Sequence, residues 1–179
     1  AVARAALLEA QTTFDVPVQK TALVIGGGAA GMSAALALEE GGFPVALVEK
    51  QPELGGNLRY VHTATPSLKG EPTRQPQQVL QQLLDRVHAN PKISLHLDSQ
   101  VVATHGFMGN FTTTLQHSDG AREELTHGVT ILATGAREYR GDEYGYGSRP
   151  SIKTQQEFEA LLDKHTRQKT ELPASVVMI

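Results

Sequence analysis

The segment over residues 21–31 constrains this chain more than any other. A continuous apolar run at residues 21–25 ends in three consecutive glycines. Such a run is typical of a strand that is buried on both faces of a parallel sheet. Small residues then open a predicted helix over residues 29–40, which stops at a Gly-Gly pair. The segment therefore predicts a buried strand, a tight turn and a helix.

The glycines have the spacing of a phosphate-binding turn. Gly26, Gly28 and Gly31 fit the pattern G-x-G-x-x-G, and Glu49 closes a second predicted strand over residues 44–49. An acid about 20 residues after such a turn is the usual partner of a dinucleotide ribose. Gly26 permits the tight turn, Gly28 lets the backbone approach a pyrophosphate, and Gly31 lets the helix pack closely on the strand. The spacing therefore predicts a dinucleotide site.

Elementary electrostatics adds two properties to this site. The N–H groups at the start of the helix, around Ala29 and Ala30, have no partner within the helix and can hold an anion. The Glu49 carboxylate can accept hydrogen bonds from ribose hydroxyls, but it would repel a 2′-phosphate. FAD and NAD therefore remain as candidate ligands, and NADP is disfavoured.

The remaining pattern is that of an α/β domain with an antiparallel insertion. An amphipathic helix over residues 75–88 follows a loop that begins at residue 51. The other expected elements are strands at residues 92–97, 101–104, 110–116, 122–125 and 129–133, and a last helix whose Thr154 and Glu157 fit a capping box. We expect a Rossmann-like domain with a central parallel sheet, in which the antiparallel β insertion spans about residues 101–126.

The chain divides into three stretches. Residues 1–20 form a lead-in helix and loop, residues 21–150 the nucleotide-binding domain, and residues 151–179 a helix and a strand. The apolar run at residues 175–179 has β-type residues but nothing after it to pair with. We therefore expect this run to be the first strand of a second nucleotide domain, and the chain to be a piece of a longer protein.

Composition excludes several classes of function. The 16 basic and 19 acidic side chains leave a formal net charge of −3, which argues against a nucleic-acid partner. The chain has no cysteine, so these residues can hold no disulfide, thiolate zinc site or cysteine-ligated iron-sulfur cluster. The seven histidines lack a metal-ligand spacing, and no apolar run is long enough to span a membrane. Without a Ser/His/Asp arrangement or paired carboxylates, we assign no catalytic side chain, and redox chemistry would need a bound cofactor.

Further elements resemble the FAD-binding half of flavoproteins that have two dinucleotide-binding domains. The segments that carry this resemblance are the pair Glu49 and Lys50, the turn Gly55, Gly56 and Asn57, and the strand end Ala133, Thr134 and Gly135. The resemblance implies that these segments bring backbone close to FAD. It also implies that the backbone near Val101 touches the adenine ring.

Longer strings resemble the flavin domain in the A-type subunit of heterodisulfide reductase. They are Ala22-Leu-Val-Ile-Gly-Gly-Gly-Ala-Ala-Gly-Met32, Leu47-Val-Glu-Lys-Gln-Pro-Glu-Leu-Gly-Gly-Asn-Leu58, Gly106-Phe-Met-Gly-Asn-Phe111, His127-Gly-Val-Thr-Ile-Leu-Ala-Thr-Gly135 and Glu143-Tyr-Gly-Tyr-Gly147. They follow the order and spacing of that family, and the resemblance covers nearly the whole chain.

This resemblance implies a fragment of a cytoplasmic, FAD-dependent oxidoreductase. The full-length protein would carry out flavin-based electron transfer, with electron bifurcation as one form of it, in a multi-subunit complex. Its partners would be other heterodisulfide reductase subunits and ferredoxin, or a hydrogenase as electron-input module. Iron-sulfur clusters belong to the full-length parent and would lie outside these residues, so the isolated chain is expected to be inactive.

Two alternatives stay open. One is the FAD domain of a generic pyridine-nucleotide disulfide oxidoreductase, which requires a dithiol and a second glycine-rich motif beyond these residues. The other is a non-catalytic nucleotide-binding scaffold that mediates the assembly of a complex. Cysteines with iron-sulfur spacing outside this chain would favour heterodisulfide reductase.

Overall fold

In the computed structural model, which describes residues 15–63 and 75–178, four short parallel strands form a central sheet. They are β1 (Ala22–Ile25), β2 (Val45–Val48), β3 (Ile93–His96) and β7 (Val129–Leu132), in the order β3-β2-β1-β7. β1 pairs with β2 on one side and with β7 on the other. The carboxyl end of β1 is therefore the point at which the strand order reverses, where open α/β sheets bind their ligands.

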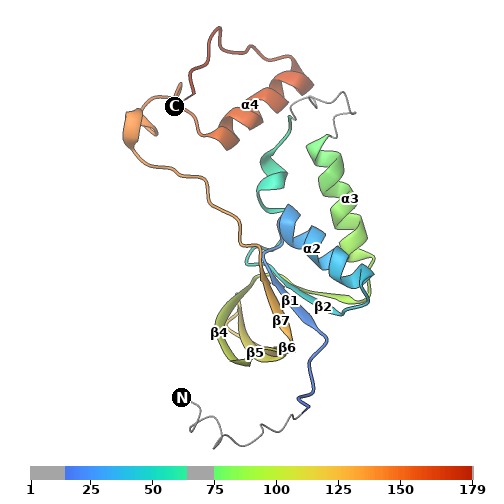
Figure 1. The fold of residues 1–179 in the computed structure, drawn as a ribbon. Helices are drawn as coiled ribbons and strands as arrows, with labels where there is room; N and C mark the ends of the chain where they lie inside the picture. Colours follow the sequence, from blue (N-terminus) through green and yellow to red (C-terminus); the bar gives the residue numbers. More distant parts are fainter. Residues whose placement is uncertain (1–14, 64–74, 179) are drawn as a thin grey trace, which may run out of the picture.

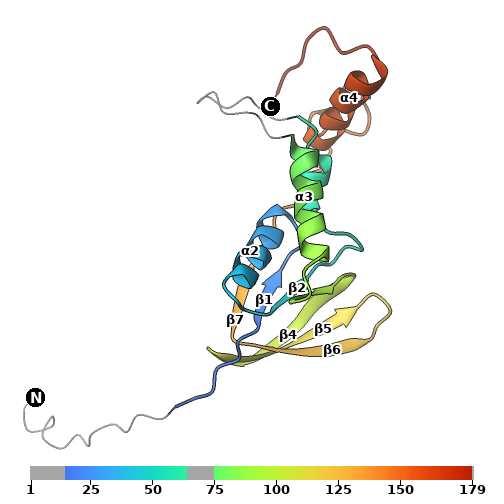
Figure 2. The same cartoon turned by 90° about the vertical axis from the view of Figure 1, so that its right-hand side faces the viewer.

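The two faces of this sheet are covered differently (Figures 1 and 2). Helices α2 (Ala29–Glu40) and α3 (Pro76–His88) lie on one face. The other face carries an antiparallel sheet of β4 (Ser99–Phe107), β5 (Asn110–His117) and β6 (Arg122–His127). The expected fold class, a Rossmann-like α/β domain with a parallel sheet and an antiparallel insertion, is confirmed.

The core has two apolar layers because side chains alternate along each strand. Val24, Val45 and Leu47 pack with Met32 of α2, between the central sheet and the helices. Leu23, Ala46 and Val48 point the other way and pack against Leu115 of β5. Each fully buried leucine or valine contributes about 1.5–3 kcal/mol. Burial on both faces explains why β1 and β2 read as uninterrupted apolar runs.

Most element boundaries agree with the expected ones within a few residues. The loop that begins at residue 51 contains a short 3-10 helix, η1 (Gly56–Tyr60). The helix expected at residues 1–9 lies outside the described residues. The strand expected at residues 175–179 was wrong for residues 175–178, which form no strand and leave Val177 84% exposed. A strand needs the backbone hydrogen bonds of a neighbour, and no described strand lies beside this run.

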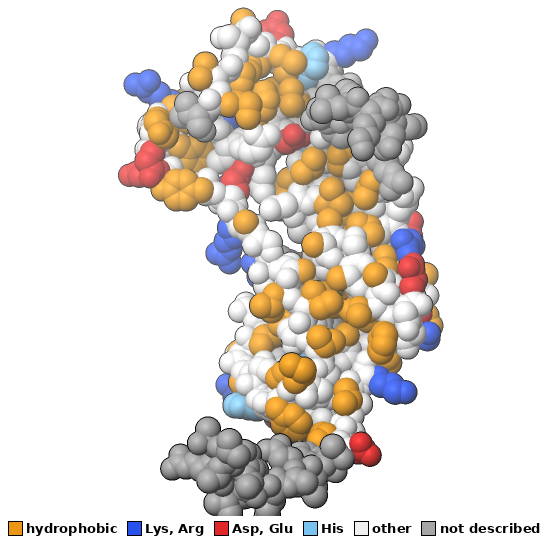
Figure 3. Space-filling model, in the orientation of Figure 1, with side chains coloured by type: hydrophobic (Ala, Val, Ile, Leu, Met, Phe, Trp, Pro, Cys, Tyr) orange, Lys and Arg blue, Asp and Glu red, His pale blue; other side chains and the backbone are white. Residues whose placement is uncertain are grey.

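The C-terminal part contains η2 (Glu143–Gly145) and α4 (Gln155–Gln168). The expected capping box is confirmed: Thr154 accepts a hydrogen bond from the Glu157 N–H, and the Glu157 carboxylate accepts one from the Thr154 N–H. Helix α4 lies beside η1 and has no buried residue (Figure 1). Apolar side chains show on the surface around α4 and over the layer of α2 and α3 (Figure 3).

Among the described residues, no helix is both long and apolar enough to cross a lipid bilayer.

Candidate functional site

The turn between β1 and α2 is closed by two glycines that leave no room for a side chain. Gly26 has a φ of +112°, and a Cβ there would overlap the carbonyl oxygen of Ala133. A Cβ on Gly31 would overlap the carbonyl oxygen of Gly26. The first turn of α2 therefore lies directly against the end of β1 and the end of β7, as the spacing of these glycines predicts.

Gly28 occupies the N-cap position of α2 and faces open space. No heavy atom lies within 4 Å of the position that a Cβ on Gly28 would take. Ala29 and Ala30 follow in the first turn and are exposed, and this turn contains no acidic residue. The N–H groups of a first helical turn have no partner within the helix and carry the positive end of the helix dipole. This open position is a suitable cradle for a phosphate group.

A second glycine pair lies against this turn. The Gly55 N–H donates to the Gly27 carbonyl oxygen at 2.7 Å, and Gly28 and Gly55 form an isolated parallel bridge. Gly56 follows in η1, and a Cβ on it would lie 3.1 Å from the Gly28 Cα. The loop after β2 is therefore bonded to the loop after β1, which makes it a wall of the cradle.

The exit of β7 forms the other wall. The Ala133 N–H donates to the Ile25 carbonyl oxygen at 2.8 Å and extends the β1–β7 pairing by one residue. Thr134 and Gly135 follow and are exposed. Asn57 donates from its Nδ2 to the Ala136 carbonyl oxygen at 3.3 Å. This hydrogen bond joins the two walls.

Glu49 lies at the end of β2 with its carboxylate held from two sides. Its side chain is buried, with Oε2 accepting the Gly27 N–H at 2.6 Å and Oε1 accepting the Gln51 N–H at 2.9 Å. Each carboxylate oxygen has a second lone pair that these bonds leave free. Glu49 is thus an oriented acceptor that is bonded to the phosphate turn itself. Sequence reasoning assigned no role to Gly27, and the uninterrupted glycine triplet was the signal for it.

Lys50 and Val101 lie differently from the rest. Lys50 is exposed. The Val101 side chain packs with Leu23 and Leu115 between the two sheets, so it is part of the core. The pairing of β4 with β5 shifts register between Val101 and Ala103, which leaves Val102 as a bulge residue with 48% of its surface exposed. A bulge leaves main-chain groups unpaired. Contact with an adenine at this point stays a prediction, and Val102 is the residue that sequence reasoning missed.

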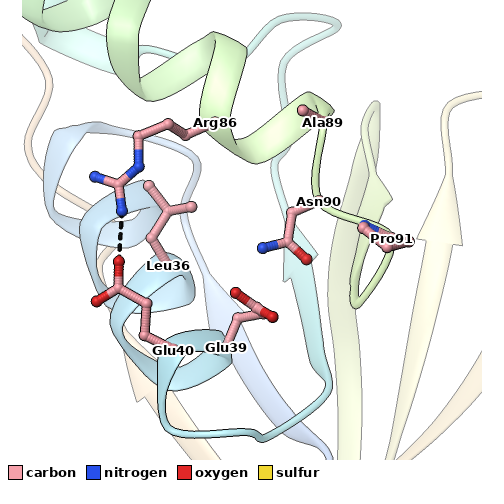
Figure 4. Close-up of a pocket in the computed structure, with 7 residues that line it drawn as sticks. All are labelled: Leu36, Glu39, Glu40, Arg86, Ala89, Asn90 and Pro91. Atoms are coloured by element: carbon pink, nitrogen blue, oxygen red, sulfur yellow. Dashed lines mark hydrogen bonds and ion pairs between the residues drawn. The ribbon is translucent and has the colours of Figure 1, made fainter.

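A separate groove lies at the opposite end of α2 (Figure 4). Glu40 pairs with Arg86 at 2.6 Å, and Glu39 pairs with Lys92 at 3.3 Å. Hydrogen bonds from Asn90 and then Lys92 hold the pKa of Glu39 below its ordinary value. Both carboxylates of the groove are therefore already neutralised, and a helix of 12 residues, about 18 Å long, separates them from the glycine turn.

Within residues 15–63 and 75–178, no group of three or more His, Asp or Glu side chains is arranged to hold a metal ion.

Known proteins with similar sequences and structures point to one group of enzymes. The chain is 38% identical over 116 residues to an A-type iron-sulfur subunit of the CoB–CoM heterodisulfide reductase of Methanopyrus kandleri, which covers 65% of this chain and 17% of that protein. It is 33% identical over 110 residues to the A-type subunit of the ferredoxin:CoB–CoM heterodisulfide reductase of Methanosarcina mazei, covering 62% of this chain and 13% of that protein. The chain therefore spans less than a fifth of the length of these relatives.

A solved structure and a family model extend this comparison. The L-proline dehydrogenase of P. horikoshii superposes with a TM-score of 0.56 at 25% identity, covering 69% of this chain and 23% of that one. The family model described as pyridine nucleotide-disulphide oxidoreductase matches residues 20–179, which include the glycine turn, Glu49 and both walls of the cradle. The chain belongs to the pyridine nucleotide-disulphide oxidoreductase family.

Proposed function

We propose that this chain binds FAD by its adenosine diphosphate half. The observation that carries the proposal is the buried hydrogen bond of 2.6 Å from the Gly27 N–H to Glu49 Oε2. Ribose and pyrophosphate are adjacent in ADP, so a site for it needs a hydroxyl acceptor and a phosphate cradle at a fixed separation. The Gly27–Glu49 bond supplies this fixed separation.

The residues present fit such a ligand. The first turn of α2, from Gly28 to Ala30, offers free N–H groups to the pyrophosphate, and the open position at Gly28 leaves it room. The segments 55–57 and 133–135 border the same cradle, with Asn57 joining them. We propose that Lys50 and the main chain around Val101 border the adenosine.

FAD, when bound, supplies the redox chemistry, and the protein supplies binding, orientation and electrostatics. The residues of this chain hold the ADP half at the carboxyl ends of β1 and β2. Glu49 accepts from the ribose hydroxyls, and the α2 N–H groups neutralise the pyrophosphate. No side chain of this site acts as a proton donor or nucleophile in the proposal.

The wider role that we propose is flavin-based electron transfer in a protein similar to the A-type subunit of heterodisulfide reductase. The names of the relatives support a multi-subunit complex with other heterodisulfide reductase subunits and with ferredoxin or a hydrogenase. In this proposal residues 21–150 are the flavin-binding domain, and iron-sulfur clusters lie in other parts of the cytoplasmic protein. Electron bifurcation is the finer form of this role.

Calorimetric titration of the chain with FAD and with NAD tests the proposal. We expect FAD to bind more tightly than NAD, and Glu49→Ala to weaken FAD by about tenfold or more, as expected for loss of a hydrogen bond to a charged group. Glu53→Ala is the matched control, because Glu53 pairs with Arg59 on the surface and makes no contact with Gly27. Tighter binding of NAD, or equal FAD affinity in the Glu49→Ala variant, would contradict the proposal.

A further inference from the structure

The main chain of Glu49 is held on both of its sides by one short stretch of chain. Its N–H donates to the His96 carbonyl oxygen at 2.9 Å, and its carbonyl oxygen accepts the Ser99 N–H at 3.0 Å. His96 ends β3 and Ser99 begins β4. The position of Glu49 therefore depends on the connection between the parallel sheet and the antiparallel sheet.

Both of these residues are tied to a single carboxylate oxygen on β6. Glu123 Oε2 lies 3.0 Å from His96 Nδ1 and 3.2 Å from His117 Nε2. The other ring nitrogen of His117, Nδ1, lies 2.8 Å from Ser99 Oγ. Glu123 thus reaches His96 directly and Ser99 through His117. We name Glu123, His96, His117 and Ser99 the carboxylate clasp.

The hydrogen atoms of the clasp can be counted. Ser99 has one hydroxyl proton, which it donates to the Leu97 carbonyl oxygen at 2.6 Å. Its oxygen must then accept from His117 Nδ1–H, and Glu123 Oε2 must accept from His117 Nε2–H. These three contacts coexist only when both ring nitrogens of His117 carry a proton. The histidines and Glu123 are not arranged to hold a metal ion, so protons are what complete the clasp.

We infer that Glu123 and His117 are positioning residues for Glu49, and that the carboxylate clasp sets how well Glu49 reads a ribose. This inference rests on the proposed function, because it takes Glu49 to be the ribose acceptor. Glu123 contacts neither Gly27 nor the cradle, and acts through His96, His117 and Ser99 alone. Removing its carboxylate frees the two groups that hold the main chain of Glu49, while the α2 turn keeps its own bonds.

The electrostatic surroundings of the clasp are simple. Arg122 and Glu124 flank Glu123 on β6, and both are exposed because neighbouring residues of a strand point to opposite faces. Asp98 lies in the turn between β3 and β4, and Lys50 follows β2 with its side chain exposed. His96 and His117 are the groups that make ion pairs with Glu123. The second proton of His117 is therefore the one that changes the clasp near neutral pH.

The test compares ADP with 2′-deoxy-ADP, which lacks the hydroxyl that Glu49 would bind. The ratio of the two dissociation constants reports the ribose contact, and inorganic pyrophosphate reports the cradle. We expect Glu123→Ala to reduce the ratio by about threefold to tenfold and to leave pyrophosphate affinity unchanged, with Glu123→Gln between the two proteins. Glu124→Gln is the matched control and should keep the ratio. A general loosening of the fold would weaken pyrophosphate equally and would overturn the inference.

A Glu49→Ala variant separates the ribose contact from its positioning. If Glu49→Ala abolishes the ratio and Glu123→Ala leaves it intact, the clasp has no positioning role and the proposed function stands. If Glu49→Ala leaves the ratio intact, the proposed function falls and the inference falls with it. In the unaltered chain the ratio should decrease from about pH 5 to about pH 8 as His117 loses its second proton, and it should be flat in Glu123→Ala. A flat profile in the unaltered chain would overturn the role of His117.

Discussion

The Gly27 N–H and the Glu49 carboxylate lie 2.6 Å apart and join the turn after β1 to the end of β2. The bond is buried, and 22 residues separate its partners in the sequence. Because a buried N–H without an acceptor is costly, the turn and the acid stabilise each other even before a ligand binds. The proposed cofactor site is in this respect also part of the fold.

This relationship predicts that Glu49→Ala destabilises the folded chain. The substitution leaves the Gly27 N–H buried without an acceptor and should lower the free energy of unfolding by about 1–3 kcal/mol. Urea unfolding followed by circular dichroism measures the change. The Glu53→Ala control removes an acid whose ion pair with Arg59 is partly exposed and should change this free energy by less than about 1 kcal/mol. Equal stability of the two variants would show that the Gly27–Glu49 bond contributes little.

The glycine turn predicts opposite outcomes for two similar substitutions. Gly31→Ala forces a methyl group onto the Gly26 carbonyl oxygen and should destabilise the fold by about 1–3 kcal/mol. Gly28→Ala meets nothing within 4 Å at a φ of −74°, so stability should be unchanged or slightly raised. Its methyl group enters the proposed phosphate position, so affinity for ADP should fall. Thermal unfolding and ADP titration of both variants check this pair, and full ADP affinity in Gly28→Ala would place the phosphate elsewhere.

Stability should depend on pH through His127. This side chain is fully buried, stacks on Phe111 with ring centroids 5.5 Å apart, and bonds through Nε2 to Thr113 Oγ1 at 2.8 Å. Burial lowers its pKa below the ordinary value of 6.5, although a hydrogen bond to the Val129 carbonyl oxygen opposes the shift. The unfolded chain therefore binds the proton more readily, and the stability contributed by neutral His127 is complete above about pH 6.5 and is lost as pH falls below it.

Urea unfolding between pH 8 and pH 5 measures this dependence. The difference in unfolding free energy between the unaltered chain and His127→Gln should shrink on acidification. His88→Gln alters an exposed histidine and serves as the control. A difference that stays constant over this range would show that His127 is not the titrating group.

The attachment of α4 depends on one acidic side chain. The Glu159 carboxylate accepts hydrogen bonds from the His62 N–H at 3.1 Å, from the Thr63 N–H at 3.3 Å and from the Thr63 hydroxyl. We expect Glu159→Ala to speed amide hydrogen exchange at His62 and Thr63 while global stability changes little, because α4 has no buried residue. Exchange measured by NMR or mass spectrometry checks this. Glu171→Ala, at an exposed position after α4, should leave both amides protected.

Local signals in the sequence were sufficient for most elements. The helix over residues 29–40 has the observed boundaries because a glycine turn begins it and a glycine pair ends it. The capping box at Thr154 is likewise a local pattern, since its two partners are three residues apart. The glycine spacing and Glu49 identified a candidate site because the chemistry of a dinucleotide demands those residue types in that order.

Other features could not be read from local patterns. The strand expected at residues 175–179 has suitable residues, but a strand forms only when another strand offers its hydrogen bonds. Val101 was expected beside a ligand, and its side chain is in the core because the register of β4 on β5 directs it inward.

The sequence by itself therefore determined the elements, their order and the residue types of the phosphate turn, because these depend on neighbours along the chain. Only the tertiary structure decided that Gly27 donates to Glu49, and that Glu123 is linked to the main chain of Glu49 through His96, His117 and Ser99. Such contacts join residues tens of positions apart, and they depend on strand order, on register and on how one sheet packs against another.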